Sequence, residues 1–571
     1  DFADGPWDDW LVPPESTTEA FSGFVWAALG SPRSETRWRA AHCVRRLADL
    51  GCEAEIDGLV EWMERDEVGA FGGRGFPFYN LHARLYLFIA LARVAEGHPG
   101  ILQKHQDVFE HHALDGLPHA LIQKFAAEAA LSVQQAFPST YDSETARQLS
   151  EVGVSKMPTQ DISRGDTLTT PWHSRGEVDQ KLDFSFGLDF DQYWFKPLAR
   201  VFGISTEQVE DLAREIAIKE WEVETDGKFV SDPRRSLWRS SSRNRETSHS
   251  HSSYPRTDTY GFYVSYHSML SVAARLLSEM PVVEDSLYGG HAWLEWFQRH
   301  DITRADRKWL ADRRDPPPLE QPTWVWEGTE DSWYQDIQKE YFLDVLSDKR
   351  DDKRWLNVFG DWQEHDSRNR ETRRVRSAFV SSEGAQALLN ALSTCSNPHD
   401  YKLPFSGEIG MEFDEPPFTL RGWAYRKEVE RGIDRLDPHA GDISYPPYRV
   451  GDHFADQFDL VEHSDGQVWT RSSEQKPVLS SRLWGRYTAN DRDGPVRSGN
   501  RLSASFEFLK EVCTSLNSSL IFEVQISRYP DRTYSSRGDD RRGEHTRIFL
   551  LSADGEIRDT EAVYQIGQGH C

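Results

Sequence analysis

One pentapeptide near the end of the chain, FEVQI, has residue types and a spacing that could support metal-dependent hydrolysis. Metal-dependent nucleases place an acidic residue and a Lys or Gln two positions apart on a strand, with another Asp on a neighbouring strand, to hold magnesium and activate water. Glu523 and Gln525 have this spacing, although no preceding Asp is placed to complete the set. The alternation also fits an ordinary half-buried strand with Phe522, Val524 and Ile526 facing inward, which is the favoured interpretation.

The glycines of the chain do not form a nucleotide-binding loop. Such a loop needs glycines that expose backbone N–H groups, followed by a Lys and a hydroxyl residue. The only Gly-Lys pair, Gly227-Lys228, lacks the upstream glycine at the required spacing, and Phe229 replaces the hydroxyl residue. The glycines between positions 69 and 75 have no lysine and precede an expected helix, which indicates a flexible inter-helix loop. We therefore expect no cofactor.

Several histidines raise the question of a metal site. His249 and His251 form an H-x-H pair, with His267 and His291 downstream. Zinc needs three or four ligands that are held rigidly, together with a second shell that orients the rings. The pair lies in a Ser-rich segment and not on a strand, which favours a solvated loop. His105 lies on an apolar helix face and is predicted to be a hydrogen-bonded core residue. The sequence predicts no metal site.

A tryptophan-rich segment mixes aromatic residues with carboxylates. It contains Trp324, Trp326, Trp333 and Tyr334. Aromatic platforms beside paired acids suit sugar binding or glycoside hydrolysis. Packing of a new domain against its neighbour is the favoured interpretation. If these side chains are exposed, they are candidates for the contact with a protein partner.

Arginines cluster twice, and the first cluster is a second candidate binding surface. Arg234, Arg235 and Arg239 surround Trp238, and further arginines lie between positions 368 and 376. Interleaved Arg and Trp can hold phosphates and stack bases. The chain as a whole has 66 basic against 93 acidic residues and a formal charge of −27, which disfavours a nucleic-acid partner. Such runs are more often solvated loops or are paired with nearby acids.

Composition places the chain among multidomain proteins of a reducing compartment. Its 571 residues exceed the size of a single compact core, and 38% of them are hydrophobic. No stretch of 18 apolar residues exists, so we expect no membrane span. The five cysteines form no C-x-x-C pair, which favours a cytoplasmic location.

Helical periodicity dominates the first half of the chain. In residues 1–150 we expect a series of helices that each have one apolar and one polar face, with Pro118 in the first turn of the last. Residues 184–312 read as a second helical region, in which Ser205 and Gln208 form a capping box. This region also holds a loop rich in Ser and Arg.

The pattern changes after the proline run Pro316-Pro317-Pro318. Residues 324–571 are predicted to form a mixed α+β domain. Strands are expected over 355–362, 374–380, 520–526 and 548–551, with helices over 385–392 and 502–516. The predicted fold class is therefore α+β and multidomain, with an N-terminal α-solenoid followed by a mixed α+β domain.

Three motifs in the first 150 residues resemble HEAT-type repeats. They are Arg37-Trp38-Arg39-Ala40-Ala41-His42, Phe78-Tyr79 before Ala83-Arg84-Leu85, and Leu117-Pro118-His119-Ala120-Leu121-Ile122. They are similar to the repeats in the C-terminal halves of large bacterial STAND (NLR-like) NTPases that act in antiviral defence. The resemblance implies that this chain is the part that senses a foreign protein, often a phage protein. It also implies that the ATPase and effector lie upstream, outside this chain, and could mediate oligomerisation.

The sequence therefore favours recognition over chemistry. We expect a non-catalytic sensor module that binds a protein partner, in which no residue is assigned a catalytic role. The alternative is a metal-dependent hydrolase, such as a nuclease, centred on Glu523 and Gln525.

Overall fold

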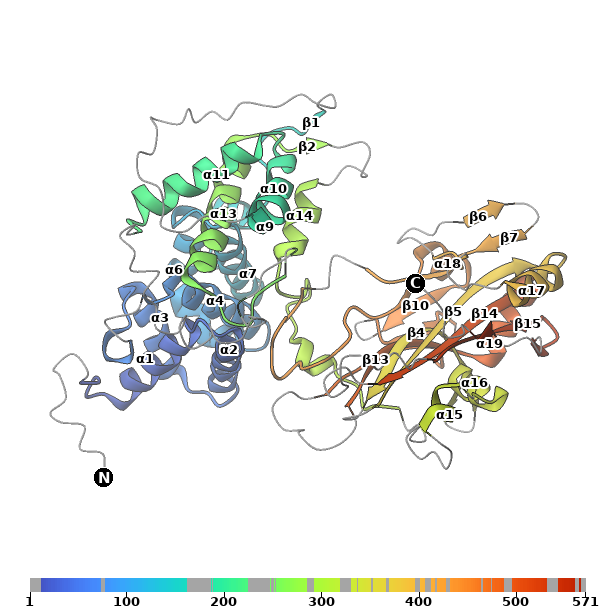
Figure 1. Cartoon of the computed structure of the whole chain (residues 1–571). Coiled ribbons are helices and arrows are strands. Elements are labelled where there is room, and N and C mark those ends of the chain that lie inside the picture. The colour runs from blue at the N-terminus through green and yellow to red at the C-terminus, as the bar shows by residue number, and fades with distance from the viewer. Residues whose placement is uncertain are drawn as a thin grey trace. The chain divides into compact units, whose positions relative to one another are not determined.

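The chain divides into two compact units in the computed structural model (Figure 1). The described residues are 12–72, 77–161, 186, 188–223, 247, 251, 253–284, 292–318, 330–335, 337–350, 353–365, 369–395, 401–405, 412–415, 418–427, 432–463, 466–473, 475–486, 496–530, 543–559 and 564–565. The first unit contains residues 1–309 and 432–438, and the second contains residues 310–431 and 439–571. A helical region is thus followed by a region built on a large antiparallel sheet, and the fold is of the mixed α+β class.

Helices form the first unit. Those up to residue 150 are α1 (Thr17–Leu29), α2 (Ser34–Asp49), α3 (Glu53–Arg65), α4 (Asn80–Gly97), α5 (Pro99–Leu102), α6 (Gln106–Glu110), α7 (Ala120–Ala136) and α8 (Ser143–Ser150). Those that follow are α9 (Leu188–Phe190), α10 (Lys196–Val201), α11 (Thr206–Glu215), α13 (Tyr260–Glu279) and α14 (Ala292–His300). The short strands β1 (Gln160–Asp161) and β2 (Val283–Glu284) pair in parallel.

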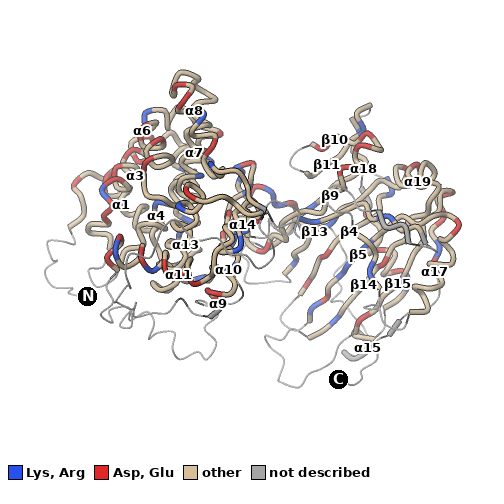
Figure 2. Tube along the Cα trace, turned by 90° about the horizontal axis from the view of Figure 1, so that it is seen from above, with Lys and Arg blue, Asp and Glu red and all other residues tan. Residues whose placement is uncertain are grey.

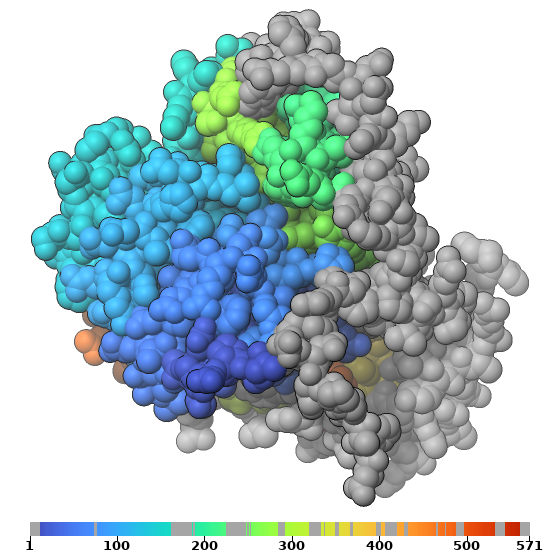
Figure 3. Space-filling model, turned by 90° about the vertical axis from the view of Figure 1, so that its left-hand side faces the viewer, coloured from blue at the N-terminus to red at the C-terminus, as the bar shows by residue number. Residues whose placement is uncertain are grey.

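Successive helices of this unit stack on one another. Helix α1 packs on α3, α2 on α4, and α4 on α7. The space-filling view shows the surface of these helices as neighbouring blue and cyan regions (Figure 3). Residues from both expected helical regions, 1–150 and 184–312, contribute to a single hydrophobic core, which includes Val25 and Trp309.

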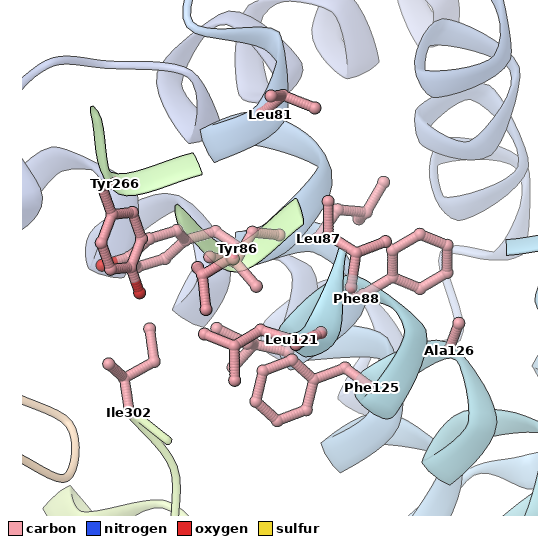
Figure 4. Close-up of a cluster of buried hydrophobic side chains, with 14 of the residues drawn as sticks. Leu81, Tyr86, Leu87, Phe88, Leu121, Phe125, Ala126, Tyr266 and Ile302 are labelled. Atoms are coloured by element: carbon pink, nitrogen blue, oxygen red, sulfur yellow. The ribbon is translucent and has the colours of Figure 1, made fainter. Parts of the chain in front are cut away.

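Helix α4 lies at the centre of that core. The prediction of one apolar and one polar face is wrong for this helix, because most of its residues from Leu81 to Ala95 are buried. Tyr86 and Phe88 of α4 lie near Leu121 and Phe125 of α7 in the close-up of the core (Figure 4). Because α4 is covered on most sides, its apolar residues are not confined to one face, and its buried His82 and Arg93 bind carboxylates.

Local capping signals set several helix ends. The capping box of Ser205 and Gln208 is confirmed at the start of α11. Helix α7 begins at Ala120, so Pro118 lies before the helix and not in its first turn. The side chain of His119 caps α7 by accepting a hydrogen bond from the backbone N–H of Ile122. An imidazole here takes the role that Ser, Thr, Asp or Asn usually has.

A short segment from late in the chain, residues 432–438, completes the first unit. Both terminal nitrogens of Arg93 contact the carboxylate of Asp434, at 3.0 and 2.5 Å, and both side chains are buried. Trp38 Nε1 donates a hydrogen bond to the carbonyl of Arg435 at 2.8 Å. These bonds satisfy polar groups that the core would otherwise leave unpaired.

Strands and short helices form the second unit. Its strands are β3 (Ser347–Arg350), β4 (Lys353–His365), β5 (Asn369–Ser381), β6 (Glu412–Glu415), β7 (Phe418–Arg421), β8 (Ala424–Tyr425), β9 (Arg449–Val450), β10 (Leu460–His463), β11 (Val468–Arg471), β12 (Pro477–Trp484), β13 (Val496–Ser505), β14 (Ser518–Pro530), β15 (Gly543–Leu551), β16 (Ile557–Asp559) and β17 (Tyr564–Gln565). Its helices are α15 (Glu330–Gln335), α16 (Lys339–Leu346), α17 (Ala385–Thr394), α18 (Asp452–Gln457) and α19 (Phe506–Ser515).

The main sheet has the strand order β10-β11-β12-β13-β4-β5-β14-β15-β16. Every pairing described in it is antiparallel. Helices α16 and α19 pack on one face with side chains such as Phe522, and α17 packs on the other with side chains such as Ile521. This alternation follows from the period of two in a strand.

The predicted strands over 355–362, 374–380, 520–526 and 548–551 are confirmed as parts of β4, β5, β14 and β15. The predicted helix over 502–516 begins later, at Phe506, because Leu502 belongs to β13. Leu502 pairs with Ser481 on one side and with Phe359 on the other. Two neighbouring strands therefore override the helical spacing of this residue, and Ser505 caps the helix that follows.

Candidate functional site: a polar groove on the sheet

A large polar groove lies over strands β13, β4, β5, β14 and β15 of the second unit. Its volume is about 1210 Å³. Tyr425, Arg426, Ser444 and Tyr448 come from the segments beside the sheet and line the groove. The tube view shows acidic and basic positions interspersed along β4, β5 and β14 (Figure 2).

Strand alternation and register place the side chains on the groove floor. Thr372, Arg374 and Arg376 of β5 lie in the groove. The register pairs Arg374 with Asp361 of β4 on one side and with Gln525 of β14 on the other. Side chains opposite each other in an antiparallel pair share a face. A carboxylate, a guanidinium and an amide therefore form one row across three strands.

Asp361 is the centre of an ion-pair network in the groove. Its carboxylate accepts hydrogen bonds from Arg374 Nε at 3.0 Å, from Arg376 Nη2 at 2.8 Å and from the hydroxyl of Tyr448. Burial by itself raises the pKa of Asp361. The positive charges of Arg376 and Arg374, together with these hydrogen bonds, outweigh burial and lower the pKa below its ordinary value. The carboxylate therefore stays ionised and fully occupied by its neighbours.

A second network supports the same strands from the opposite face of the sheet. Glu371 accepts hydrogen bonds from Arg373 Nε at 2.6 Å, from Arg528 Nε at 2.7 Å and from the Tyr341 hydroxyl at 2.5 Å. Burial raises the pKa of Glu371, but the charges of Arg373 and Arg528 outweigh it, so the pKa lies below its ordinary value. This network ties β5 to β14 beneath the groove.

Some polar side chains in the groove have no partner in the described part of the chain. Gln525 and Ser527 of β14 and Glu544 of β15 line the groove and make no hydrogen bond or ion pair there. They supply an amide, a hydroxyl and a carboxylate, which can donate and accept hydrogen bonds. The groove can therefore bind a polar surface without first breaking the Asp361 network.

The predicted pair Glu523 and Gln525 lies on one face of β14, while Phe522, Val524 and Ile526 are buried on the other. The expected half-buried strand is confirmed. Gln525 lines the groove, whereas Glu523 lies farther along the strand, opposite Arg376. Within the described ranges, no group of three His, Cys, Asp or Glu side chains could hold a metal ion.

The predicted aromatic surface is not exposed where the structure describes it. Trp333 and Tyr334 are 3% and 2% exposed. The carbonyl of Trp333 accepts a hydrogen bond from Arg528 Nη1 at 2.7 Å, whose guanidinium lies 4.8 Å from the Trp333 ring centroid. These two residues therefore pack the core of the second unit and are not available to a partner. Trp324 and Trp326 lie outside the described residues.

Of the two arginine clusters, only the second is described. Arg234, Arg235, Trp238 and Arg239 lie outside the described residues. The arginines between 369 and 376 lie on β5 and not in a loop; Arg370, Arg374 and Arg376 share one face of the strand and Arg373 lies on the other. Arg374 and Arg376 pair with Asp361 of β4, and Arg373 pairs with Glu371 of its own strand, which matches the expectation that such runs are neutralised nearby; Arg370 donates to the amide oxygen of Gln363.

Histidines form a buried hydrogen-bonded chain in the first unit. His119 Nε2 lies 2.9 Å from His267 Nδ1, His267 Nε2 lies 2.9 Å from His82 Nδ1, and His82 Nε2 lies 2.5 Å from Asp258. The Ile122 N–H donates to His119 Nδ1, so the proton of the neutral His119 ring is on Nε2 and is donated to His267 Nδ1. By the same reasoning His267 donates from Nε2 to His82, and His82 donates from Nε2 to Asp258, so each imidazole is assigned as neutral with its proton on Nε2. Asp258 also pairs with Arg37 at 3.2 Å.

The histidines singled out in the sequence have different surroundings in the structure. His267, which is downstream of the H-x-H pair in the sequence, lies in the buried chain, while His249 and His291 lie outside the described residues. His105 Nε2 lies 2.7 Å from Asp57, so its predicted role as a hydrogen-bonded residue is confirmed. The chain of three histidines was missed because its members come from α4, the N-cap of α7 and α13, which are far apart in the sequence.

The buried histidines predict acid sensitivity of the first unit. Burial lowers the pKa of His119 and of His300 to about 3, from an ordinary 6.5, and lowers those of His82 and His267 well below it. At a pH between the folded-state pKa and 6.5, these histidines are protonated in the unfolded state and neutral in the folded state. The free energy of unfolding therefore decreases as the pH falls below 6.5, by about 1.4 kcal/mol per pH unit for each histidine.

This pH dependence is measured by hydrogen exchange of the α4 and α13 amides at pH 7 and pH 5, corrected for intrinsic exchange rates. We expect much lower protection at pH 5. The exposed His98 serves as a control, because His98→Gln should leave the difference unchanged. Equal protection at the two pH values would contradict the assignment of neutral buried imidazoles.

Neither a comparison with protein-family models nor one with curated proteins gives a match to this sequence. In the described part of the chain, no helix has the length and apolar character needed to cross a membrane. The groove therefore has to be interpreted from its own geometry.

Proposed function

We propose that the chain is a non-catalytic recognition module and that the polar groove of the second unit is its contact surface for a protein partner. The observation that carries this proposal is that some side chains of the groove are paired with one another while others have no partner among the described residues. The charged groups around Asp361 neutralise one another, whereas Gln525, Ser527 and Glu544 are free to bond a ligand.

The size of the groove supports a macromolecular ligand. Small-molecule sites usually have volumes of about 300–1,000 Å³ and mostly apolar linings. This groove has a volume of about 1210 Å³ and a floor of Gln, Ser, Thr, Arg and Asp side chains. A polypeptide segment fits such a floor, because its backbone amides can donate to and accept from side chains such as Gln525, Ser527 and Glu544.

The helical unit is also consistent with a role in recognising a protein partner. We propose that its stacked helices, α1 on α3, α2 on α4 and α4 on α7, are HEAT-like repeats of an α-solenoid. By the resemblance to STAND NTPases, the partner would be a phage protein and the setting the bacterial cytoplasm. Oligomerisation would depend on domains upstream of this chain.

The hydrolase alternative has weaker support. Gln525 and Asp361 do share a row of the sheet, as a metal-dependent centre would require. Asp361, however, already binds two guanidinium groups and a tyrosine hydroxyl. Its lone pairs are thus used by the protein itself. We expect Glu523→Ala to leave any nuclease activity of a preparation unchanged in a magnesium-dependent cleavage assay.

The proposed function is tested with two groove variants and a matched control. Affinity capture from bacterial lysates, with and without phage infection, identifies candidate partners by mass spectrometry, and each is then purified and titrated directly. We expect Gln525→Ala and Arg374→Glu to weaken binding at least about tenfold, since contacts at an interface centre are worth about 1–2 kcal/mol or more.

Arg558→Glu is the control for charge reversal. The side chains of Arg374 and Arg558 are 54% and 46% exposed, and each pairs with an acid, but Arg558 lies on strand β16 outside the groove. The control should bind like the unmodified chain. A partner that binds both groove variants with unchanged affinity would refute the groove as the contact surface.

A further inference from the structure

A second pocket of the sheet unit is cationic, in contrast to the acidic chain. It lies where β4 begins and α19 starts, beside β11 and β12, and its volume is about 750 Å³. Five cationic side chains line it, against two carboxylates. The cations are Lys353, Arg354, Arg471, Lys476 and Arg482, and the carboxylates are Glu507 and Glu511.

Most of these cations have no counter-ion. Lys353, Lys476 and Arg482 make no hydrogen bond or ion pair in the described structure. The Arg354 guanidinium lies 4.3 Å from the ring centroid of Phe506 and contacts no carboxylate among the described residues. Four positive charges around one pocket repel each other, and a bound anion removes that repulsion.

The two carboxylates of the pocket are already paired. Glu511 contacts Arg471, and Glu507 lies 3.1 Å from Lys510. Arg471 also keeps one buried nitrogen, Nε, without a partner. The acids therefore neutralise Arg471 and Lys510 and leave the other four charges unbalanced.

The first turn of α19 adds to the positive potential. Ser505 and Phe506 line the pocket, and the Ser505 hydroxyl accepts a hydrogen bond from the Phe508 N–H. The positive end of a helix dipole and its free N–H groups favour an anion at this position. The field of this end acts in the same direction as the four side-chain charges.

We propose that this pocket binds a small molecule that carries two or more phosphate groups. Several separate cations match a ligand with several negative charges, and guanidinium groups bind phosphate in a bidentate manner. The volume lies within the usual range for small ligands, about 300–1,000 Å³. A long nucleic acid is disfavoured because the chain carries a net charge of −27 and would repel it outside the pocket.

The probes for this site are inorganic orthophosphate, pyrophosphate and tripolyphosphate, titrated calorimetrically into the full chain at low salt. We expect affinity to rise at least about tenfold from orthophosphate to tripolyphosphate and to fall with added salt, as charge pairing requires. Lys476→Gln and Arg482→Gln should each weaken tripolyphosphate binding about tenfold. Neither side chain has a partner in the described structure, so both variants should fold normally.

Two controls make the result specific. Lys402→Gln removes an exposed lysine of the same unit outside the pocket and should leave binding unchanged. Gln525→Ala should also leave it unchanged, so that this proposal and the proposed protein-binding groove fail separately. Absence of tripolyphosphate binding would overturn the site, and so would binding by both pocket variants as tight as that of the unmodified chain. So would tighter binding of single-stranded DNA than of tripolyphosphate, because a nucleic-acid surface would then explain the charges.

Discussion

Replacing Glu371 by glutamine should destabilise the sheet unit by about 3–5 kcal/mol, because removing one partner of a buried ion pair leaves the other charge uncompensated. Arg373 and Arg528 are 3% and 5% exposed and both bind Glu371. With a neutral amide between them, two buried guanidinium groups would face each other across strands β5 and β14. Glu364, whose carboxylate lies 3.7 Å from Arg373, is farther away than Glu371 and would compensate the two charges only in part.

The measurement is hydrogen exchange of the β5 and β14 amides, which reports on this unit alone. Glu556→Gln is the control, since Glu556 is 59% exposed and pairs with Arg558 at the surface. Its effect should stay below about 1 kcal/mol. A loss of less than about 1 kcal/mol for Glu371→Gln would contradict a network that depends on the carboxylate charge.

The Glu371 network also predicts a loss of stability at acid pH. Its cause differs from that of the histidines, because the pKa of Glu371 is lowered by neighbouring positive charges, whereas the pKa values of the histidines are lowered by burial. The pKa of Glu371 is lower in the folded state than its ordinary 4.5, so the unfolded state binds the proton first. The stabilisation is therefore complete above pH 4.5 and is lost as the pH falls through the folded-state pKa. The Glu371→Gln variant should lack this acid-dependent loss in the sheet unit.

Replacing Asp258 by asparagine should destabilise the helical unit by a similar amount, about 3–5 kcal/mol. The Asp258 side chain is 2% exposed and binds both Arg37 and His82. Asparagine removes the counter-ion of the buried Arg37. Its amide can also place a donor against the Nε2 proton of His82, which would disturb the direction of the whole histidine chain.

Two measurements distinguish these effects. Hydrogen exchange of α4 and α13 reports the loss of stability, and nitrogen NMR of the imidazoles reports the tautomers of His82, His119 and His267. Asp49→Asn is the control, because Asp49 is 39% exposed and pairs with His98 at the surface. Unchanged tautomers together with unchanged stability would show that the Asp258 charge does not organise the chain.

Local sequence patterns predicted much of the secondary structure. The alternation around Glu523 and Gln525 correctly indicated a strand with one buried face. The spacing of Ser205 and Gln208 correctly indicated a capping box. Both signals work because a strand face and a helix cap involve residues only two or three positions apart.

Local sequence patterns did not predict features that depend on contacts with distant segments of the chain. Leu502 has helical spacing with the residues after it but pairs with β4 and β12. The sequence left open whether Trp333 and Tyr334 are exposed, and the structure shows that they are buried. Exposure depends on what covers a residue, and the neighbours of these side chains come from positions such as Arg528, about two hundred residues later.

The sequence by itself determined the helical first half, the change to strands after the proline run, the acidic charge and the faces of individual strands, because these depend on composition and short-range periodicity. Only the tertiary structure decided that Asp361, Arg374 and Gln525 share one row, and that Lys353, Lys476 and Arg482 surround one pocket. The register of strands and the packing of helices bring these groups together, and both are set by the whole core rather than by neighbouring residues.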